Sequence, residues 1–436
     1  MRCPLVHRLR RLVALTGLLA GLEVRAAEPV AILLYDKDPS HVWNRLYSAL
    51  MARAPEAEAA VKDLLDPPFW SDTDHLLDGA TNRTAVALLG EFVHGPPRPD
   101  SMSALQRAVM QRDLLAIFHW IADHHRKPWG RLEWTAPMRG LFGALARAIH
   151  HVALSDEEIR KLPDNYAAAV AAPDAVTTFD AAHPTPFLPN DLLADDGPWI
   201  ALEPNGDDGL AATFHFTFFN GRSAFEVRMR HPDGRAAGEA YLKQLAEMRH
   251  PFVSEKPANV GRFMPNSDPP LGPWVNPETP QFPPGTMWAL VRRAVVAGAK
   301  GAPVVSPLVE SVQIRVYRNF DIHSEQAQTF FEWETRRALL LGKTGFHLTT
   351  PLDQAYASFP GGDHRKQTTL NCFQCHSGPG IHSVQSRVRI FEERLVRPPD
   401  FRAVNRARVD EITTVRARSL PGWTLLQWLW DDQPAR

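Results

Sequence analysis

Cysteine is so scarce in this chain that disulfide bonds cannot hold its fold together. Only three cysteines occur in 436 residues, and two of them, Cys372 and Cys375, are two residues apart and followed directly by His376. Hydrophobic residues make up 44% of the chain and charged residues 22%, the balance of an ordinary globular protein. A chain of this length holds two or three domains, each stabilised by buried apolar side chains. The fold must therefore come from packed cores rather than from a disulfide framework.

The first residues have the pattern of a secretory signal peptide. Arginines precede an apolar stretch over residues 12–22, and small residues around Ala26 fit a cleavage site. A helix over that stretch spans roughly 16 Å, about half a bilayer core, so we expect a cleaved leader, residues 1–26. An uncleaved anchor at the membrane surface is the alternative. We predict an exported protein, periplasmic or secreted, with no transmembrane span in the mature chain. Cleavage also removes Cys3 and leaves two cysteines.

Charge and motifs exclude several classes of function. The 48 Lys and Arg residues nearly balance the 49 Asp and Glu residues, and the net charge at pH 7 is −1. A nucleic-acid partner favours a basic excess, so we expect no nucleic-acid binding. The sequence contains no Gly-rich phosphate loop, no GxSxG and no HExxH. Dinucleotide-dependent, hydrolase and zinc-protease activities therefore have no support.

Residues 37–175 are predicted to form a helical domain. Apolar residues recur at helical spacing over residues 110–121 and again over residues 138–149. Thr135 is placed to cap the second of these helices, with Pro137 near its first position. Ser155 and Glu158 have the spacing of a capping box at the start of a third, shorter helix.

Residues 190–345 are predicted to form a β-containing domain. Phe214, Phe216 and Phe218 alternate with polar residues, Asn220-Gly221 is a turn signal, and alternation resumes over residues 225–230. This pattern predicts a β-hairpin with one buried face and one solvated face. Further predictions are a helix over 236–249, strands over 287–296 and 312–316, a helix or a strand over 330–341, and a closing helix over 421–430 with Trp423, Leu426 and Trp430 facing the core.

A proline-rich loop interrupts the predicted β-containing domain. Residues 251–284 contain ten of the 38 prolines in the chain. Proline neither continues a helix nor pairs within a central strand, so this segment is predicted to be extended and irregular. A loop that covers the domain surface is the expected role.

The sequence Cys372-Phe-Gln-Cys375-His376 is the pattern that attaches c-type haem. Positions i, i+3 and i+4 of a helical turn project from one face. Two thiols at that spacing can therefore form thioethers with the two vinyl groups of one porphyrin, and the adjacent imidazole lies under the iron. In bacteria this attachment takes place outside the cytoplasm, where the predicted leader would send the chain.

On these residues the chain resembles the c-type cytochromes. The resemblance covers Cys372, Cys375 and His376, with small residues at Gly378-Pro379-Gly380 behind them, and it does not extend to the roughly 400 other residues. It implies one covalent haem c carried by the two cysteines, with His376 as an axial ligand of the haem iron. Residues 346–436 are accordingly expected to form a mono-haem c segment.

Other chemistry at the two cysteines stays open. They could form a simple disulfide or a redox-active pair, although no βαβ pattern precedes them. They could also supply half of a zinc site, although structural zinc normally takes four ligands and no second cysteine pair is present. A motif that fixes only three positions also arises by chance.

The sixth ligand of such an iron is not defined by the sequence. No methionine follows Met287, which excludes the downstream methionine that small electron-transfer cytochromes commonly use. The remaining possibilities are a histidine, Met264 or Met287, or an open position. The candidate histidines are His364, His347 and His382.

Charged residues and histidines elsewhere have weaker claims to a role. Four cations flank the motif and are candidates for pairing with haem propionates, namely Arg365, Lys366, Arg387 and Arg389. His119, His124-His125 and His150-His151 are interpreted as core or surface histidines. Adjacent residues on a helix point about 100° apart and do not easily share a metal.

We therefore predict an α+β fold, with a helical N-terminal domain followed by a β-containing domain and a C-terminal haem c segment. The expected function is electron transfer with a redox partner protein or a small-molecule donor or acceptor. A peroxidase-like oxidoreductase with an open distal site is the first alternative, since more than 300 residues precede the motif. A non-haem structural or binding protein with a Cys372–Cys375 disulfide is the second.

Overall fold

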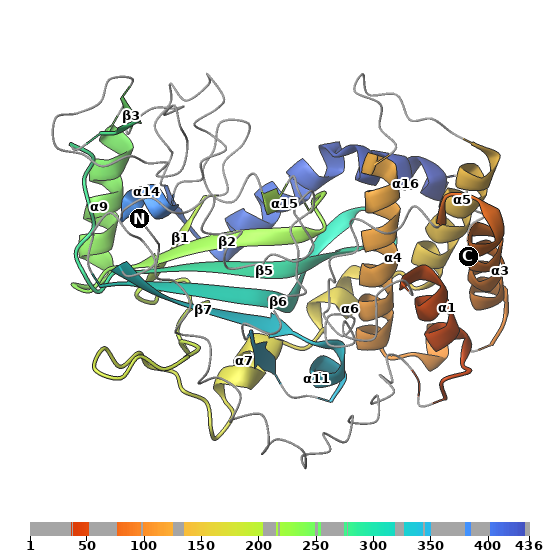
Figure 1. Cartoon of the computed structure of the whole chain (residues 1–436), viewed down its shortest axis with the longest axis horizontal. Coiled ribbons are helices and arrows are strands. Elements are labelled where there is room, and N and C mark those ends of the chain that lie inside the picture. The colour runs from red at the N-terminus through yellow and green to blue at the C-terminus, as the bar shows by residue number, and fades with distance from the viewer. Residues whose placement is uncertain are drawn as a thin grey trace, which may run out of the picture. The chain divides into compact units, whose positions relative to one another are not determined.

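Helices and one large antiparallel sheet make up the part of the chain that the structure describes (Figure 1). This structure is a computed structural model, and it confirms the predicted α+β class. The described residues are 36, 38–51, 76–96, 99–124, 135–203, 215–216, 219–248, 252–253, 274–276, 278–318, 327–342, 345–349, 380–384 and 402–431.

The N-terminal helices follow the apolar stripes and caps of the sequence. They are α1 (Val42–Met51), α3 (Gly79–His94), the 3₁₀ turn η3 (Pro99–Ser101), α4 (Ala104–His124), α5 (Ala136–His151), α6 (Asp156–Arg160) and α7 (Asn165–Val170). The predicted stripes of α4 and α5 are buried. The Thr135 hydroxyl accepts a hydrogen bond from the Met138 amide at 3.3 Å, and Ser155 and Glu158 form both arms of the capping box. These predictions are confirmed because caps and stripes are local signals.

Seven strands form the sheet in the order β8-β7-β6-β5-β2-β1-β9, and each neighbouring pair is antiparallel. The strands are β1 (Trp199–Leu202), β2 (Ser223–Arg230), β5 (Met287–Ala297), β6 (Pro303–Tyr317), β7 (Gln328–Thr335), β8 (Phe346–Leu348) and β9 (Ala403–Val404). A separate pair joins β3 (Phe252–Val253) to β4 (Trp274–Val275), both within the proline-rich segment. The strands predicted over 287–296 and 312–316 are confirmed as parts of β5 and β6.

The predicted β-hairpin is wrong in its first arm. His215 and Phe216 lie in a helical turn rather than in a strand. The turn itself is real, since Asn220 and Gly221 have positive φ values of 54° and 65°. The second arm is β2, but its partners are β1 and β5. A turn is set by local residue preference, whereas strand pairing depends on segments far away in the chain.

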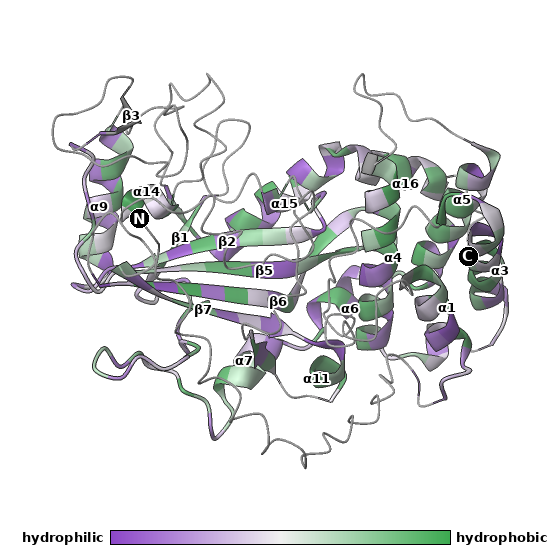
Figure 2. Ribbon diagram, in the orientation of Figure 1, coloured by the Kyte–Doolittle hydropathy of each residue, from purple (hydrophilic) through white to green (hydrophobic). Residues whose placement is uncertain are grey.

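Both faces of β2 are covered, so the predicted solvated face is also wrong. Glu226 and Arg228 are completely buried, where the alternation predicted exposed side chains. They form an ion pair with one another, and Glu226 also lies 3.5 Å from Arg293 on β5. Buried charges of this kind are tolerated because they are paired. Figure 2 shows hydrophilic residues alternating with hydrophobic ones along the strands of the sheet.

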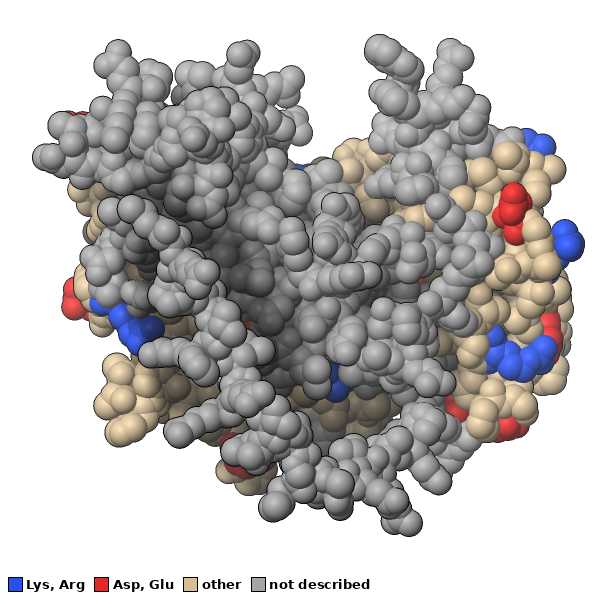
Figure 3. Space-filling model, viewed as in Figure 1, with Lys and Arg blue, Asp and Glu red and all other residues tan. Residues whose placement is uncertain are grey.

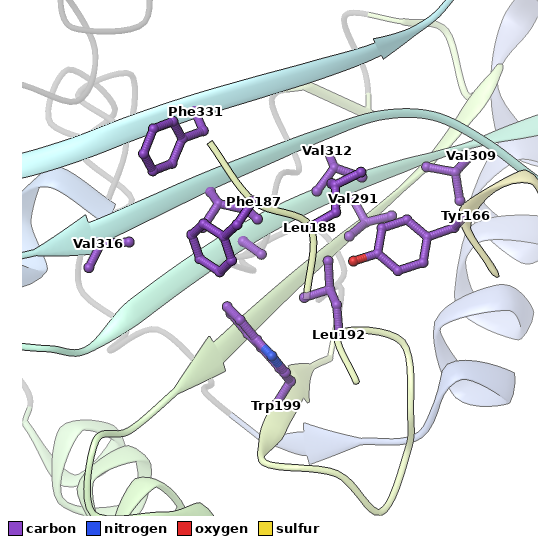
Figure 4. Packing of buried hydrophobic residues seen from close by; sticks show 12 residues of the cluster. Tyr166, Phe187, Leu188, Leu192, Trp199, Val291, Val309, Val312, Val316 and Phe331 are labelled. Carbon is purple, nitrogen blue, oxygen red and sulfur yellow. The ribbon is translucent and has the colours of Figure 1, made fainter. Parts of the chain in front are cut away.

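One face of the sheet carries the main apolar core, and we call it the valine face. It is the face of Ala289 and Val291 on β5 and of Val312, Ile314 and Val316 on β6, each at most 2% exposed. Residues from the segment between α7 and β1 cover it, as Phe187, Leu188 and Leu192 do in Figure 4. Tyr166 on α7 completes this core and donates a hydrogen bond to the Pro189 carbonyl.

Five further helices occur among the described residues, and α15 and α16 are the last two. They are α9 (Arg235–Glu247), α11 (Arg337–Leu341), α14 (Ile381–Val384), α15 (Arg406–Ser419) and α16 (Pro421–Asp431). The predicted helix over 236–249 is α9, and the ambiguous segment 330–341 divides into the end of β7 and α11. The closing helix is confirmed as α16, with Trp423, Leu426 and Trp430 buried against α4 and α5. None of the described helices has the length and apolar character needed to cross a membrane.

Three consecutive polar residues of α4 connect that helix to the sheet and to α11. The Gln111 side chain exchanges two hydrogen bonds with the backbone of Ala297 on β5, at 2.7 and 3.0 Å. Arg112 forms a buried ion pair with Glu310 on β6, and Asp113 forms one with Arg337. Charged groups without such partners would be costly to bury, so these contacts fix the position of α4 against the sheet.

Candidate functional site

The second face of the sheet differs from the valine face in chemistry. Residues opposite one another in antiparallel strands share a face. Leu290 pairs with Gln313, Trp288 with Arg315, and Arg315 with Phe330. We call this second face the arginine face, after Arg292 and Arg315. Its members on the central strands are Trp288, Leu290 and Arg292 of β5, Gln313, Arg315 and Tyr317 of β6, and Gln328, Phe330 and Glu332 of β7.

The middle of the arginine face is partly accessible, although it lies on the central strands of a seven-stranded sheet. Leu290, Arg292, Gln313 and Arg315 are half-buried. Their neighbours on the valine face are buried completely. A central strand has a neighbouring strand along each edge. Solvent therefore reaches these side chains from the face of the sheet and not from its edges. The arginine face therefore offers a mixed apolar and cationic surface to a ligand or to another part of the chain.

Charge on this face is arranged in contacts between neighbouring strands. The Gln313 amide donates a hydrogen bond to Glu332 at 2.8 Å. The Arg315 guanidinium lies 5.3 Å from the centroid of the Phe330 ring, and the Arg292 guanidinium lies 4.9 Å from that of Phe219. Burial raises the pKa of Glu332. A raised carboxyl pKa shifts Glu332 toward its neutral form, and the cations of this face are Arg292 and Arg315.

His215 lies beside this face, in the helical turn that precedes β2. Its ring contacts Phe225 edge-on, with the two centroids 5.6 Å apart. Burial, followed by the charges of Arg292 and Arg315, lowers the pKa of His215 to about 4. The imidazole is therefore neutral at pH 7, the form that can accept a hydrogen bond or bind a metal.

One end of the arginine face holds several buried polar atoms without hydrogen-bond partners among the described residues. They are Nε1 of Trp288, Nη1 of Arg315, and both amide atoms of Gln328. Trp288 and Arg315 are directly opposed, and Gln328 is opposed to Tyr317, two residues further along β6. We call Trp288, Arg315 and Gln328 the donor cluster. Leaving such polar atoms buried and unpaired costs about 1–3 kcal/mol each, and the three N–H donors among them favour an acceptor.

The same end of the arginine face anchors the segment that follows the cysteine motif. Ile381 on α14 is fully buried against an apolar cluster that includes Trp288, Tyr317 and Phe282. The hydroxyl groups of Tyr317 and Ser383 are hydrogen-bonded at 2.5 Å. Gly380 has a φ of 51°, a conformation that suits glycine at the start of this short helix. The chain thus returns to the sheet next to the donor cluster.

The motif itself, Cys372, Cys375 and His376, lies outside the described residues, as do His364, Met264 and the flanking cations Arg365, Lys366, Arg387 and Arg389. His382 belongs to α14, but its side chain is not described. His347 is described and lies on β8 opposite Glu334, which places it on the arginine face at the far end from Tyr317. Two sequence candidates for the sixth ligand, His347 and His382, are therefore on elements at opposite ends of one face.

Two described histidines of the helical part pack against aromatic residues. His119 is fully buried and its ring lies 5.0 Å from that of Trp423, and His150 packs edge-on against Trp430. His124 is in α4, and its side chain is not described. Within the described ranges, no group of three or more His, Cys, Asp or Glu residues is arranged to hold a metal ion.

Sequence reasoning missed Arg292, Arg315, Glu332, Gln328 and His215. The signal for Arg315 was present, because Gln313 and Arg315 alternate with Val312, Ile314 and Val316. Only the apolar residues of that alternation were used in the prediction, and its polar residues were given no role. His215 had no local signal, since its position depends on a helical turn that the hairpin prediction did not include.

We compared the chain with protein-family models, with curated proteins and with solved structures, and it matches none of them. The charged side chains visible at the helical end of Figure 3 are of both signs and interspersed, with no extended patch of one sign. The motif and the arginine face are therefore the two features of the chain that bear on its function.

Proposed function

We propose that this protein is an exported, mono-haem c-type protein that transfers electrons. The observation that carries this proposal is Cys372-Phe-Gln-Cys375-His376, which uses both cysteines left after the predicted leader. Cys372 and Cys375 would hold the porphyrin through thioethers, and His376 would bind the iron. Bound haem c supplies one-electron exchange between Fe(III) and Fe(II).

The described residues fit such a group. A porphyrin is planar and largely apolar, and it carries two carboxylates on one edge. The arginine face combines apolar side chains, such as Leu290 and Phe330, with cations and with the unpaired donors of the donor cluster. Ile381 comes five positions after His376, and five residues of chain span at most about 18 Å. This length supports a haem position close to the Tyr317 end of the face.

The sixth position decides between a carrier and an enzyme. A carrier keeps two axial ligands, and His347, His364 and His382 remain the sequence candidates. An oxidoreductase of the peroxidase-like class needs an open position, and the partly accessible middle of the arginine face favours it as the second candidate function. Its partner in either case would be a redox protein or a small donor or acceptor.

Mass spectrometry and optical spectroscopy test the proposal. The full chain should be expressed in a bacterial host that attaches haem c, and the exported protein purified. We expect a denatured mass raised by one haem, an N-terminus at Ala27, and a reduced α-band typical of c-type haem. The double variant C372A/C375A should lose covalent haem, whereas H150A, at a histidine distant in sequence, should keep it. A colourless protein of unmodified mass would contradict the proposal.

Ligand binding then separates the two functions. A low-spin ferric spectrum that cyanide and carbon monoxide change only slowly supports the carrier. A high-spin ferric spectrum with rapid binding of both ligands supports the oxidoreductase instead. H376A should change the spin state in either case, because His376 would be an iron ligand.

A further inference from the structure

The donor cluster combines the kinds of group that bind a carboxylate. Arg315 supplies a cation, while Trp288 and Gln328 supply neutral N–H donors from the strands on either side. The Gln328 side chain is 4% exposed and Trp288 is 3% exposed, and their polar atoms have no hydrogen-bond partners among the described residues. A carboxylate is the acceptor that a guanidinium and N–H donors on neighbouring strands favour, because a charge-assisted hydrogen bond is stronger than a neutral one.

The described acidic residues do not occupy this position. Glu332, the acidic residue two positions from Phe330 on the same face, accepts its hydrogen bond from Gln313 instead. Burial raises its pKa and so disfavours its charged form, while the charges of Arg292 and Arg315 act on this carboxyl in the opposite direction. Glu310 contacts Arg112 and lies 3.6 Å from Arg292, away from the donor cluster along β6.

The neighbourhood of the donor cluster identifies the source of the carboxylate. Tyr317 is opposed to Gln328 and holds Ser383, seven residues after His376. Ile381 packs against Trp288 itself. The chain that follows the cysteine motif therefore reaches the sheet beside the donor cluster, and a haem on that motif would bring its propionates within reach of it.

We infer that Arg315, Trp288 and Gln328 bind a propionate of the haem, so that the Tyr317 end of the arginine face is the propionate-binding end of the haem site. This inference rests on the proposed function. It assigns a role to residues 44 to 84 positions before Cys372, none of which the motif itself indicates. It also explains why polar atoms are buried at that end of the sheet.

Potentiometry of three variants tests this inference. Fe(III) carries one more positive charge than Fe(II), so a nearby cation disfavours the oxidised form. R315L should raise the ratio of oxidised to reduced protein at a fixed potential by about tenfold, which corresponds to about 59 mV for one electron. R315K keeps the charge and should stay close to the wild type. R230L, at a half-buried arginine on the valine face, is the matched control and should leave the ratio unchanged.

The outcomes separate the two proposals. Absence of covalent haem from the wild type contradicts the proposed function, and the propionate site then fails with it. Covalent haem in all variants, with R315L and R230L giving the same potential as the wild type, overturns the propionate site alone. Loss of stability in R315L without a change in potential would assign the donor cluster to a carboxylate of the protein, and that outcome also overturns the inference. Q328L, which removes a donor without changing charge, should shift the potential in the same direction by less.

Discussion

The hydroxyl of Tyr317 on β6 and the hydroxyl of Ser383 on α14 are hydrogen-bonded at 2.5 Å, and both side chains are buried. Ser383 also donates to the Gly380 carbonyl at 2.7 Å, so Tyr317 is the donor to Ser383. Sixty-six residues separate the two partners, and the cysteine motif lies between them. This contact therefore joins α14, the first described element after the motif, to the end of the sheet.

Removal of the Tyr317 hydroxyl should weaken the attachment of α14 to the sheet. Y317F leaves the aromatic ring in its apolar cluster but deletes one buried hydrogen bond, so we expect a loss of about 1 kcal/mol in the free energy of unfolding. S383A should cost a similar amount. Urea denaturation of both variants and of the double variant measures the coupling. Fully additive losses would show that the two hydroxyls do not stabilise each other.

Removal of one partner of the Arg112–Glu310 ion pair should destabilise the protein strongly. Replacement of both partners by uncharged residues should destabilise it less. Both side chains are at most 1% exposed. R112M leaves a buried carboxylate without its main partner, and we expect a loss of about 3–5 kcal/mol. R112M/E310Q removes both charges and should be more stable than R112M alone. E91Q removes the carboxylate of the exposed pair Arg45–Glu91 and serves as control, with an expected loss below about 1 kcal/mol. Equal losses for R112M and E91Q would contradict this prediction.

Two glycines in helices should respond to alanine in opposite ways. A Cβ at Gly422 would lie 2.4 Å from Nδ1 of the buried His119, so G422A should lose about 1–3 kcal/mol of unfolding free energy. A Cβ at Gly140 on α5 would meet nothing within 4 Å. G140A should therefore gain about 0.5–1 kcal/mol, because alanine favours a helix over glycine. Thermal denaturation of the two variants checks the sign of each change.

Burial of His119 should make the protein less stable in acid. Burial, followed by the charges of Arg222 and Arg112, lowers the pKa of His119 well below its ordinary 6.5. The native state thus keeps the ring neutral while the unfolded chain takes up a proton below pH 6.5, so stability falls as pH decreases. Each pH unit costs up to about 1.4 kcal/mol for this one group.

H119M isolates that contribution. Neither ring nitrogen of His119 has a hydrogen-bond partner among the described residues, so a methionine at this position should change stability at pH 7 by less than about 1 kcal/mol. Between pH 7 and pH 5 the variant should lose less stability than the wild type. Urea midpoints at the two pH values provide the measurement, and parallel pH dependence of the two proteins would refute the assignment.

How far the sequence predicts this fold depends on whether a signal is local. Thr135 and Ser155 cap helices through groups two or three residues away, and both were predictable. Asn220-Gly221 defined a turn but not its partner strands, which come from β1 and β5. Glu226 and Arg228 were expected in solvent because alternation shows that a strand has two different faces. It does not show which of these faces other segments cover. At the candidate site the motif was predictable, whereas the donor cluster depends on strand register between β5, β6 and β7.

His347 on the arginine face and His215 beside it are the described candidates for a sixth iron ligand under the proposed function. His347 is opposed to Glu334 on β7, and His215 lies beside Arg292 and Arg315 with a neutral ring at pH 7. A haem whose propionate reaches the donor cluster would extend over the middle of this face. If a protein ligand fills the sixth position from this face, we expect exactly one of H215A and H347A to convert ferric haem from low spin to high spin.

Electronic absorption and electron paramagnetic resonance of the ferric protein measure this conversion. The converted variant should also bind cyanide faster than the wild type, because water replaces the lost imidazole at the iron. H364A and H382A belong in the same series, since these two residues remain sequence candidates, and H150A on α5 is the control that should stay low spin. A change of spin state confined to H364A or H382A would place the sixth ligand outside the arginine face. A low-spin spectrum in all of these variants would exclude histidine at each tested position.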